Sequence, residues 1–530
     1  MAQPVPDALP GFAFLAEHLR TIVGPEQVLT DPDQCALYGA DIYSRGESPS
    51  LVVQPRSTTE LAAAVTALSS AGVPVIGRGG GMSYTSGYAP SRAGCAMLDL
   101  GQMNRVLEIN TEDMYVTVEC GCTWHELHEA LKGSGLRTPF WGTLSGITAT
   151  VGGGLSQNGI FWGSGQFGFA VDSVLGLEVV LADGSVVRTG AGAQVNGSPF
   201  SRHYGPDLTG LFTSDAGALG VKATATLKLI PELPVHRFAS FDFENHAELI
   251  SAMSRISREG LAMECFAFDP FLQSQRMQRE SLAKDVKALA GVMKASGSLA
   301  GALREGARVA LAGRGYMGDV QWSLHLVVEE RSEQGADAAL ARIREICAAG
   351  REIENSIPKI LRANPFTPLN NVLGPAGERW APVHTLVPHS RAREVTESVQ
   401  ALFDTHAEAI ETHGVGVGFL LATVSTHVFV VEPVFFWPDE RFAIHEQTVE
   451  PAVLARLPKL EANPAARELV ASLRGEMVDL FSRQGGIHMQ IGRSYPYLRD
   501  LDPATRALVE ALKQAMDPEG TMNPGSLGLG

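Results

Sequence analysis

The chain contains 530 residues, more than a single hydrophobic core usually supports, so we expect two or more cores. Hydrophobic residues make up 45% of the chain, which is ordinary for a globular protein and argues against extended disorder. With 42 Lys and Arg against 58 Asp and Glu, the net charge of −16 disfavours binding to phosphate backbones, so no nucleic-acid partner is expected.

The cysteines and the N-terminus bear on the compartment. The six cysteines are dispersed, and only Cys120 and Cys122 are close in sequence. There is no CxxC motif and no Cys/His spacing of the zinc type, so we expect free thiols in a reducing compartment and no metal site. No signal peptide and no apolar run of about 18 residues is found. The simplest expectation is a cytoplasmic enzyme that is not transmembrane, while a peripheral membrane partner stays open.

The first predicted elements form a β–α–β unit. Residues 51–55 predict a strand, and the following helix begins at Ser57 or Thr58, with Glu60 in its first turn. Residues 73–78 predict a second strand, which ends in a glycine cluster. From residue 94 to 230 the pattern changes to short strands, with one helix at 124–132 and a hairpin around Ala182-Asp183-Gly184. This region is typical of an α+β domain.

The composition changes again near Pro231. Two strand–helix patterns follow, with strands at 322–328 and 383–387 and helices at 337–349 and 391–406. Two further strands are predicted at 414–424 and 427–435, and helices at 465–483 and 505–516. Residues 276–314 predict a helix with a mobile loop. We therefore expect an α+β fold with domains at 1–232 and 233–490 and a C-terminal segment at 491–530.

Glycine-rich loops lie beside several of the predicted strands. The run from Arg78 to Ser83 contains three consecutive glycines, which let successive N–H groups face one anion. The run is neither a GxGxxG nor a P-loop, and alone it is better explained as a structural turn. Further loops at 150–156, 163–168 and 217–220 change that balance, because an extended dinucleotide needs several stretches of bare backbone.

These motifs together resemble a known family. Five runs look like the FAD-binding domain of the flavoproteins that include vanillyl-alcohol oxidase and 4-cresol dehydrogenase. They are PRSTTEL, VPVIGRGGGMSYTSGY, TVGGGLSQNG, GFAVDSVLGLEVVLADGSVVRTG and PDLTGLFTSDAGALGVKATATLKL. They are also similar to D-lactate and glycolate dehydrogenases. The resemblance covers about residues 50–232, and AMDPEGTMNPG resembles the segment that returns to the flavin domain. It implies FAD, a PCMH-type FAD-binding domain, an α/β (ferredoxin-like) cap and, as in many relatives, a homodimer.

The resemblance also places residues around FAD. Those expected at the pyrophosphate are Arg78, Gly79, Gly80, Gly81, Met82 and Ser83. Those expected at the ribityl chain and isoalloxazine are Gly152, Gly153, Gly154, Ser156, Gly163 and Gly168, with Gly220 and Val221 on the adenine side and Asn523 and Pro524 by the flavin. Many relatives attach FAD through a histidine where this chain has Met82. Trp380 or Ala381 stands at the second attachment position, although His384 is close, so we expect non-covalent FAD.

Four residues are candidates for the chemistry. His488 resembles the histidine of the GEHGIG motif, a proposed base in the hydroxy-acid branch, and a histidine suits proton transfer near neutral pH. His427 is expected to begin a strand and line the site, with a buried structural histidine as an equal alternative. Arg493 would hold an oxyanion, and Tyr84 would bind a phenol. A purely structural role is also an alternative for His488, Arg493 and Tyr84.

Departures from both branches leave the substrate open. Gly492 stands where the phenol-oxidising branch has a tyrosine, and Ile487 stands where GEHGIG has a metal-binding glutamate. We expect an FAD-dependent oxidase or dehydrogenase that moves hydride from a CH–OH or benzylic C–H of an aromatic small molecule, with phenols among the options. The alternatives are a D-2-hydroxy-acid dehydrogenase and a non-catalytic flavin-binding subunit. The electron acceptor, O2, a cytochrome or a quinone, cannot be read from the sequence.

Overall fold

The computed structural model describes residues 10–279 and 320–530, and most of the predicted helix and loop at 276–314 falls outside these ranges. The described part of the N-terminal half contains two larger sheets and one pair of short strands. The first has four strands in the order β1 (Val28–Leu29), β2 (Leu51–Val53), β4 (Ala96–Asp99) and β3 (Val75–Arg78). The second is antiparallel, in the order β5 (Val106–Asn110), β6 (Tyr115–Glu119), β10 (Val221–Lys228), β8 (Val174–Val180) and β9 (Val186–Arg188). The short β7 (Leu136–Arg137) and β11 (Ile230–Pro231) pair with each other.

The predicted β–α–β unit is present. Helix α3 (Thr58–Ser70) begins at Ser57, whose hydroxyl accepts a hydrogen bond from the Glu60 amide. Strands β2 and β3 both pair in parallel with β4, so β3 delivers Arg78 and the glycine loop to one edge of the first sheet. The other helices of this half are α1 (Pro10–Val23), α2 (Pro32–Ala36), α4 (Trp124–Leu131), α5 (Val151–Gln157), α6 (Ser164–Phe167) and α7 (Leu208–Leu211).

The second half is built on an eight-stranded sheet, called the cap sheet below. Its strands are β12 (Val235–Phe243), β13 (Glu264–Phe268), β14 (Trp322–Glu330), β15 (Arg351–Ile353), β16 (Arg379–Pro382), β17 (Thr385–Val387), β18 (Gly416–Val424) and β19 (Val428–Trp437). Seven of them follow the order β15-β12-β14-β13-β18-β19-β16, and β17 pairs with β19. All these pairs are antiparallel.

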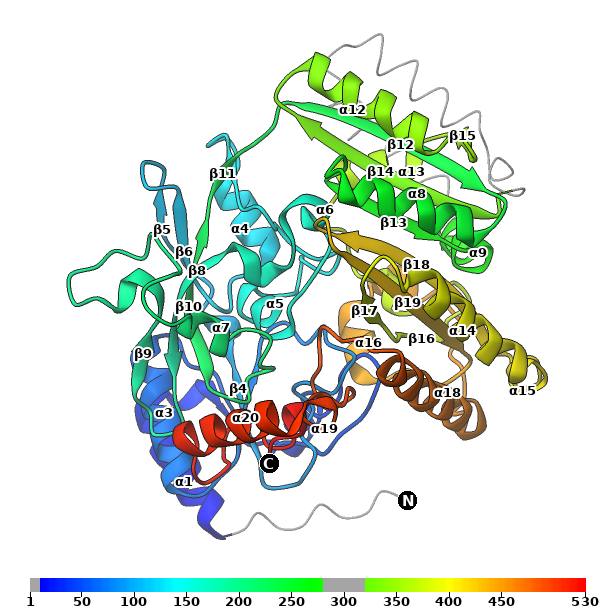
Figure 1. Ribbon diagram of the computed structural model, residues 1–530. Coiled ribbons are helices and arrows are strands. Elements are labelled where there is room, and N and C mark those ends of the chain that lie inside the picture. The colour runs from blue at the N-terminus through cyan, green and yellow to red at the C-terminus, as the bar shows by residue number, and fades with distance from the viewer. Residues whose placement is uncertain (1–9, 280–319) are drawn as a thin grey trace.

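The two faces of the cap sheet have different neighbours. One face packs against α8 (His246–Arg258), α12 (Glu333–Ile346), α14 (Ala392–Thr405) and α18 (Pro464–Arg483) in the largest hydrophobic core. The other face carries Phe266, Val430 and Val434 and contacts Phe161 of the N-terminal half. This second face is therefore turned toward the first domain (Figure 1). The remaining helices are α9 (Pro270–Arg279), α13 (Ser356–Ala363), α15 (Ala407–Thr412), α16 (Ala443–Thr448), α17 (Pro451–Leu454) and α19 (Tyr497–Asp500).

The C-terminal segment returns to the N-terminal half. Helix α20 (Pro503–Met516) lies beside the N-terminal elements, in red in Figure 1. After it, the Val75 amide donates to the Thr521 carbonyl and the Asn523 amide donates to the Val75 carbonyl, both at 2.8 Å. The tail thus extends the edge of β3. The predicted α+β class, with helices and sheets in both halves of the chain, is confirmed.

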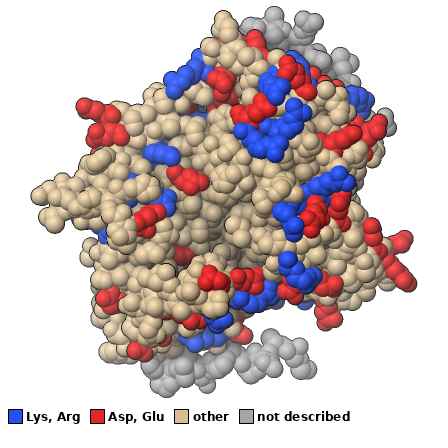
Figure 2. Space-filling view, in the orientation of Figure 1, with Lys and Arg blue, Asp and Glu red and all other residues tan. Residues whose placement is uncertain are grey.

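The surface shows no separation of charge on the visible face. Basic and acidic side chains are interspersed there (Figure 2). Within residues 10–279 and 320–530, no helix combines the length and apolar character needed to cross a membrane.

Candidate functional site

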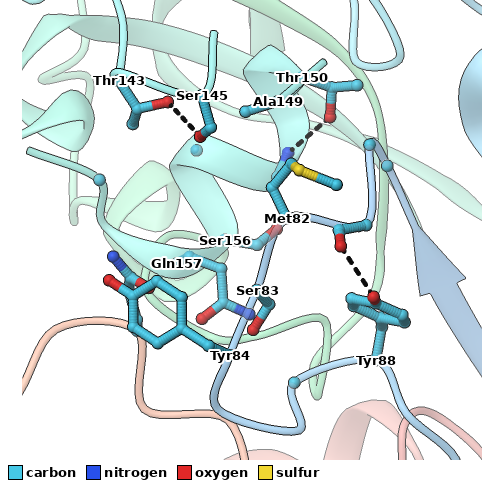
Figure 3. Close-up of a pocket in the computed structure, with 18 of the residues that line it drawn as sticks. Met82, Ser83, Tyr84, Tyr88, Thr143, Ser145, Ala149, Thr150, Ser156 and Gln157 are labelled. Atoms are coloured by element: carbon cyan, nitrogen blue, oxygen red, sulfur yellow. Dashed lines mark hydrogen bonds between the residues drawn. The ribbon is translucent and has the colours of Figure 1, made fainter. Parts of the chain in front are cut away.

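A large cavity lies between the glycine loops and the inner face of the cap sheet. It encloses about 1830 Å³ of space free of protein atoms, its open mouth included. One wall comes from the N-terminal half and the other from β18, β19 and the segments around Trp380 and Gln490. Figure 3 shows the part nearest the first glycine loop.

The first glycine loop follows β3 and forms one side of the cavity. A Cβ added to Gly80 would lie 1.9 Å from the Thr148 carbonyl oxygen, so only glycine fits there. The amides of residues 80–83 donate no hydrogen bond within the described residues. The Arg78 guanidinium lies over the rings of Tyr38 and Tyr88, at 4.7 and 5.4 Å from their centroids, and its buried Nε has no hydrogen-bond partner. Free N–H donors beside a fixed cation suit an anion such as a pyrophosphate.

The second glycine loop closes against the first. The Thr150 hydroxyl accepts a hydrogen bond from the Gly153 amide at 3.2 Å, which starts the short helix α5 (Figure 3). A Cβ at Gly79 would lie 2.2 Å from that hydroxyl, and a Cβ at Gly152 would lie 2.6 Å from Cys120 Cβ. The bare backbone of both loops is therefore required by close contacts within the wall.

Most residues expected around FAD line this one cavity. They are Arg78, Gly79, Gly80, Gly81, Met82, Ser83, Gly152, Gly153, Gly154, Ser156, Gly220 and Val221. Gly163, Gly168 and Asn523 do not line it. Gly163 instead donates its amide to Glu264 at 2.8 Å, and Gly159, Ile160 and Phe161 take its place at the wall. The predicted loop is correct in region, but the residues that reach the cavity lie a few positions earlier.

The cap side of the cavity is apolar with a few polar groups. Tyr84 is partly buried there and meets Trp380 edge to face, with ring centroids 5.7 Å apart. Burial raises the pKa of Tyr84 well above its ordinary value of 10.0, Glu432 raises it further, and a hydrogen bond with Gln490 opposes the shift. Tyr84 is therefore a protonated donor at neutral pH. The apolar lining includes Ile42, Ile160, Phe161, Leu369, Val372, Leu420, Ala422 and Met489.

Glu432 was missed by the sequence analysis. Alternation along β19 places Val430 and Val434 in the core that faces the first domain, and Glu432 lies on the same face. Phe429 and Val431 point to the helix-covered face. Glu432 is the single carboxylate among the described residues that line the cavity. An acidic residue in the middle of an otherwise apolar strand was the signal that could have found it.

His427 requires a correction. It lies in the exposed turn between β18 and β19, one residue before β19 begins, and does not line the cavity. Side chains alternate between the two faces of β19. The face that His427 would share with Phe429 and Val431 is the one covered by helices α14 and α18. Position in the sheet therefore gives His427 no access to a substrate.

His488 also lies outside the cavity lining. Its ring stacks on Tyr495 with centroids 4.1 Å apart, and its Nδ1 is 2.7 Å from the His384 carbonyl. Burial lowers the pKa of His488 to about 4, so the ring is neutral at pH 7. His384 is fully buried, and its Nε2 and Nδ1 meet the Met489 carbonyl at 2.7 Å and the Tyr495 hydroxyl at 3.3 Å. This His384–Tyr495–His488 stack supports the segment behind Tyr84 instead of supplying a base.

Arg493 acts as a clamp for the tail. Its guanidinium donates to the carbonyls of Ser86, Ala89 and Pro524 and to the Asn523 side chain. Asn523 in turn donates to the Gly87 and Ala216 carbonyls. Because these acceptors belong to the protein and Arg493 does not line the cavity, the expectation that it holds a substrate oxyanion is corrected.

No candidate metal cluster accompanies the cavity. Within the described parts of the chain, three or more His, Cys, Asp or Glu residues nowhere gather in a way that could hold a metal ion. Bare backbone loops, unpaired amides, a fixed arginine and an apolar cap side instead fit a long dinucleotide with an aromatic ring system.

The fold and this cavity define a two-domain flavoprotein. Residues 49–190 match the family model described as an FAD binding domain. This match supports an FAD-binding domain in the N-terminal half, as the sequence motifs indicated, and FAD as the cofactor.

Named relatives come from both branches. The chain is 33% identical over 217 residues to "Glycolate oxidase subunit GlcD" of Bacillus subtilis, which covers 41% of this chain and 44% of that protein. It is 28% identical over 256 residues to the "4-cresol dehydrogenase [hydroxylating] flavoprotein subunit" of Pseudomonas putida, covering 46% and 48%. These matches span less than half the length of either relative. The crystal structure of p-cresol methylhydroxylase with substrate bound superposes with a TM-score of 0.74 at 18% identity, covering 99% of this chain and 98% of that one.

Proposed function

We propose that the protein is an FAD-dependent oxidoreductase that oxidises a CH–OH or benzylic C–H group of an aromatic, phenolic small molecule. FAD, when bound, supplies the acceptor for the two electrons of such an oxidation. Arg78, the amides of residues 80–83 and the wall at Gly152–Gly154 would hold it. The observation that carries the substrate class is the cap side of the cavity, where Tyr84, Trp380 and Glu432 converge.

The cap side suits a flat apolar molecule with one polar end. Its lining is predominantly aliphatic and aromatic, and the polar groups there are few and specific. Tyr84, whose hydroxyl is protonated at neutral pH, donates a hydrogen bond to the phenol oxygen of the substrate. Glu432 accepts the proton that the phenol hydroxyl of the substrate loses. The charge of Glu432 also acts on the Tyr84 hydroxyl. Gln490 orients Tyr84 through their hydrogen bond.

A D-2-hydroxy acid is the second candidate. The 33% identity with a glycolate oxidase subunit favours it, although that match covers less than half of each protein. A carboxylate substrate needs a cation near the reacting carbon. Among the described residues that line the cavity, the cationic side chains are Arg78 and Lys222, both on the flavin-domain wall, while the cap side presents Glu432. Charge therefore favours the aromatic alcohol over the hydroxy acid.

The test is anaerobic reduction of the bound flavin, followed by its visible absorbance. We expect 4-hydroxybenzyl alcohol to bleach the flavin band and D-lactate to leave it unchanged. Bleaching by D-lactate alone would replace the proposal with the hydroxy-acid reading. Bleaching by neither, with full bleaching by dithionite, would indicate a non-catalytic flavin-binding subunit. Readmitting O2, a cytochrome c or a soluble quinone then identifies which acceptor reoxidises the flavin.

A further inference from the structure

Two buried lysines lie close to the cavity, and their hydrogen bonding differs. Lys513 of α20 donates to the Ala218 carbonyl, the Met522 carbonyl and Asp517, at 2.8, 2.9 and 2.5 Å. An ammonium has three N–H donors, so Lys513 is fully satisfied. Lys222 of β10 is 3% exposed, yet its ammonium has one hydrogen-bond partner among the described residues, Asp215 at 2.5 Å.

Lys222 belongs to the cavity wall. It lines the cavity with its neighbours Gly220 and Val221. Its positive charge also acts on Cys120, another lining residue, where it opposes the burial that raises the pKa of that thiol to about 12. Cys120 in turn touches the wall at Gly152. Lys222 is thus linked through Cys120 to Gly152, and all three residues line the cavity from the N-terminal half.

Burial of a lysine with two unused donors is costly unless a ligand or water satisfies them. Asp215 holds the ammonium in place, and its own second carboxylate oxygen is buried with no hydrogen-bond partner among the described residues. The pair is thus incomplete on both sides. The other cation in the lining, Arg78, stands at the first glycine loop, where the pyrophosphate is expected. Lys222 is a second cation in the lining, on strand β10 of the same domain.

We propose that Lys222, which directly follows Gly220 and Val221 in the part of the lining expected on the adenine side, is a further FAD-binding residue. Its ammonium would donate hydrogen bonds to acceptor atoms of the AMP half of the cofactor and so favour FAD over FMN. Asp215 is the positioning residue for this ammonium. The inference rests on FAD as the cofactor and is independent of the substrate, so it stands or fails without reference to the oxidation proposed above.

The test compares two variants that both lack the Asp215 carboxylate. Lys222→Met alone would leave Asp215 buried without its counter-ion, which destabilises folded proteins strongly. The comparison is therefore Asp215→Asn against Lys222→Met/Asp215→Asn, which differ only in the ammonium. Dissociation constants for FAD and FMN are measured on apoprotein by quenching of flavin fluorescence. Unfolding temperatures of the apoproteins report structural damage separately.

We expect the double variant to bind FAD at least about tenfold more weakly than Asp215→Asn, as for loss of a hydrogen bond to a charged group, with FMN affinity equal in the two. Equal FAD affinity would overturn the proposal, and so would an equal loss for FAD and FMN. Should the double variant not fold, Lys222→Gln replaces it, because its amide can still donate to Asp215. Lys222→Gln is then expected to bind FAD more weakly than the wild type, with equal affinity for FMN. Lys228→Gln, on the same strand outside the cavity lining, serves as the control.

Discussion

The Gly163 amide donates a 2.8 Å hydrogen bond to Glu264, and this contact joins the flavin-domain loop that carries Phe161 to strand β13 of the cap sheet. Glu264 is buried, and its second oxygen has no hydrogen-bond partner in the described residues. Beside it, Glu329 is neutralised by Arg137 at 2.7 Å and by Arg362. One carboxyl of the interface is thus paired with arginines, and the other faces a backbone amide.

The Glu264 contact predicts a specific pH dependence. Burial, followed by the neighbouring Glu329, raises the pKa of Glu264 from 4.5 to about 7. A group whose pKa is raised in the folded state binds its proton more tightly there, so its contribution to stability is lost as the pH rises from about 4.5 to 7. Glu264→Gln keeps the acceptor for Gly163 but cannot ionise. We expect it to raise the free energy of unfolding at pH 8, relative to wild type, by on the order of 1–3 kcal/mol, with little gain at pH 5.

Urea unfolding at the two pH values measures this difference. Glu468→Gln, at an exposed position of α18, is the control and should show the same small change at both. A Glu264→Gln variant less stable than wild type at pH 8 would contradict this account of the interface.

Glu432 provides the second prediction. Glu432→Gln retains the shape of the side chain but removes its capacity to accept a proton, so the rate constant for anaerobic flavin reduction by 4-hydroxybenzyl alcohol should fall by about 10²-fold or more. FAD affinity should be unchanged, because the residue lies on the cap side. His427→Gln, in the exposed turn before the same strand, should behave as wild type. Stopped-flow absorbance measures both, and a larger effect for His427→Gln would reverse the assignment.

Gly80 provides a test of the cofactor wall. An alanine Cβ there would meet the Thr148 carbonyl at 1.9 Å, and backbone cannot yield as a flexible side chain can. We expect Gly80→Ala to lose most of its bound FAD and to be destabilised by about 2 kcal/mol. Gly475→Ala is the matched control, since nothing lies within 4 Å of its added Cβ and the position is inside helix α18. Flavin content per protein and the unfolding temperature report both effects; full flavin content in Gly80→Ala would refute the tight-wall interpretation.

Arg493 tests the corrected role of the tail. Its removal leaves carbonyls of two loops and the Asn523 side chain without their charged donor. Arg493→Met should therefore lower the free energy of unfolding by about 3 kcal/mol. The KM for the aromatic alcohol should stay within about twofold of wild type in the protein that remains folded, since this residue touches no substrate. A KM raised by tenfold or more with unchanged stability would restore the substrate-binding role.

The sequence predicted most of the fold because its signals are local. Ser57 caps α3 through the Glu60 amide three residues away, and the glycine loops follow directly after the strands that present them. The glycine motifs also predict FAD as the cofactor. Such features depend on neighbours in the chain, which a sequence displays.

The errors concern contacts that only the tertiary fold decides. Which face of β19 meets the cavity depends on where helices α14 and α18 pack, and this packing leaves Glu432, not His427, in the lining. Arg493 was read as a substrate ligand because its acceptors at Ser86 and Ala89 lie some 400 positions away in the chain. His488 was chosen for its motif, whereas stacking on Tyr495 turns it away from the cavity.

The central claim is that the polar end of an aromatic substrate lies between Tyr84 and Glu432, and one measurement tests it most directly. The rate constants for anaerobic flavin reduction by 4-hydroxybenzyl alcohol and by benzyl alcohol are compared in wild type and Tyr84→Phe, which keeps the ring contact with Trp380. The account predicts a fall of about 10-fold or more for the phenolic alcohol in Tyr84→Phe and no change for benzyl alcohol. Equal rate constants for the phenolic alcohol in the two proteins would contradict it.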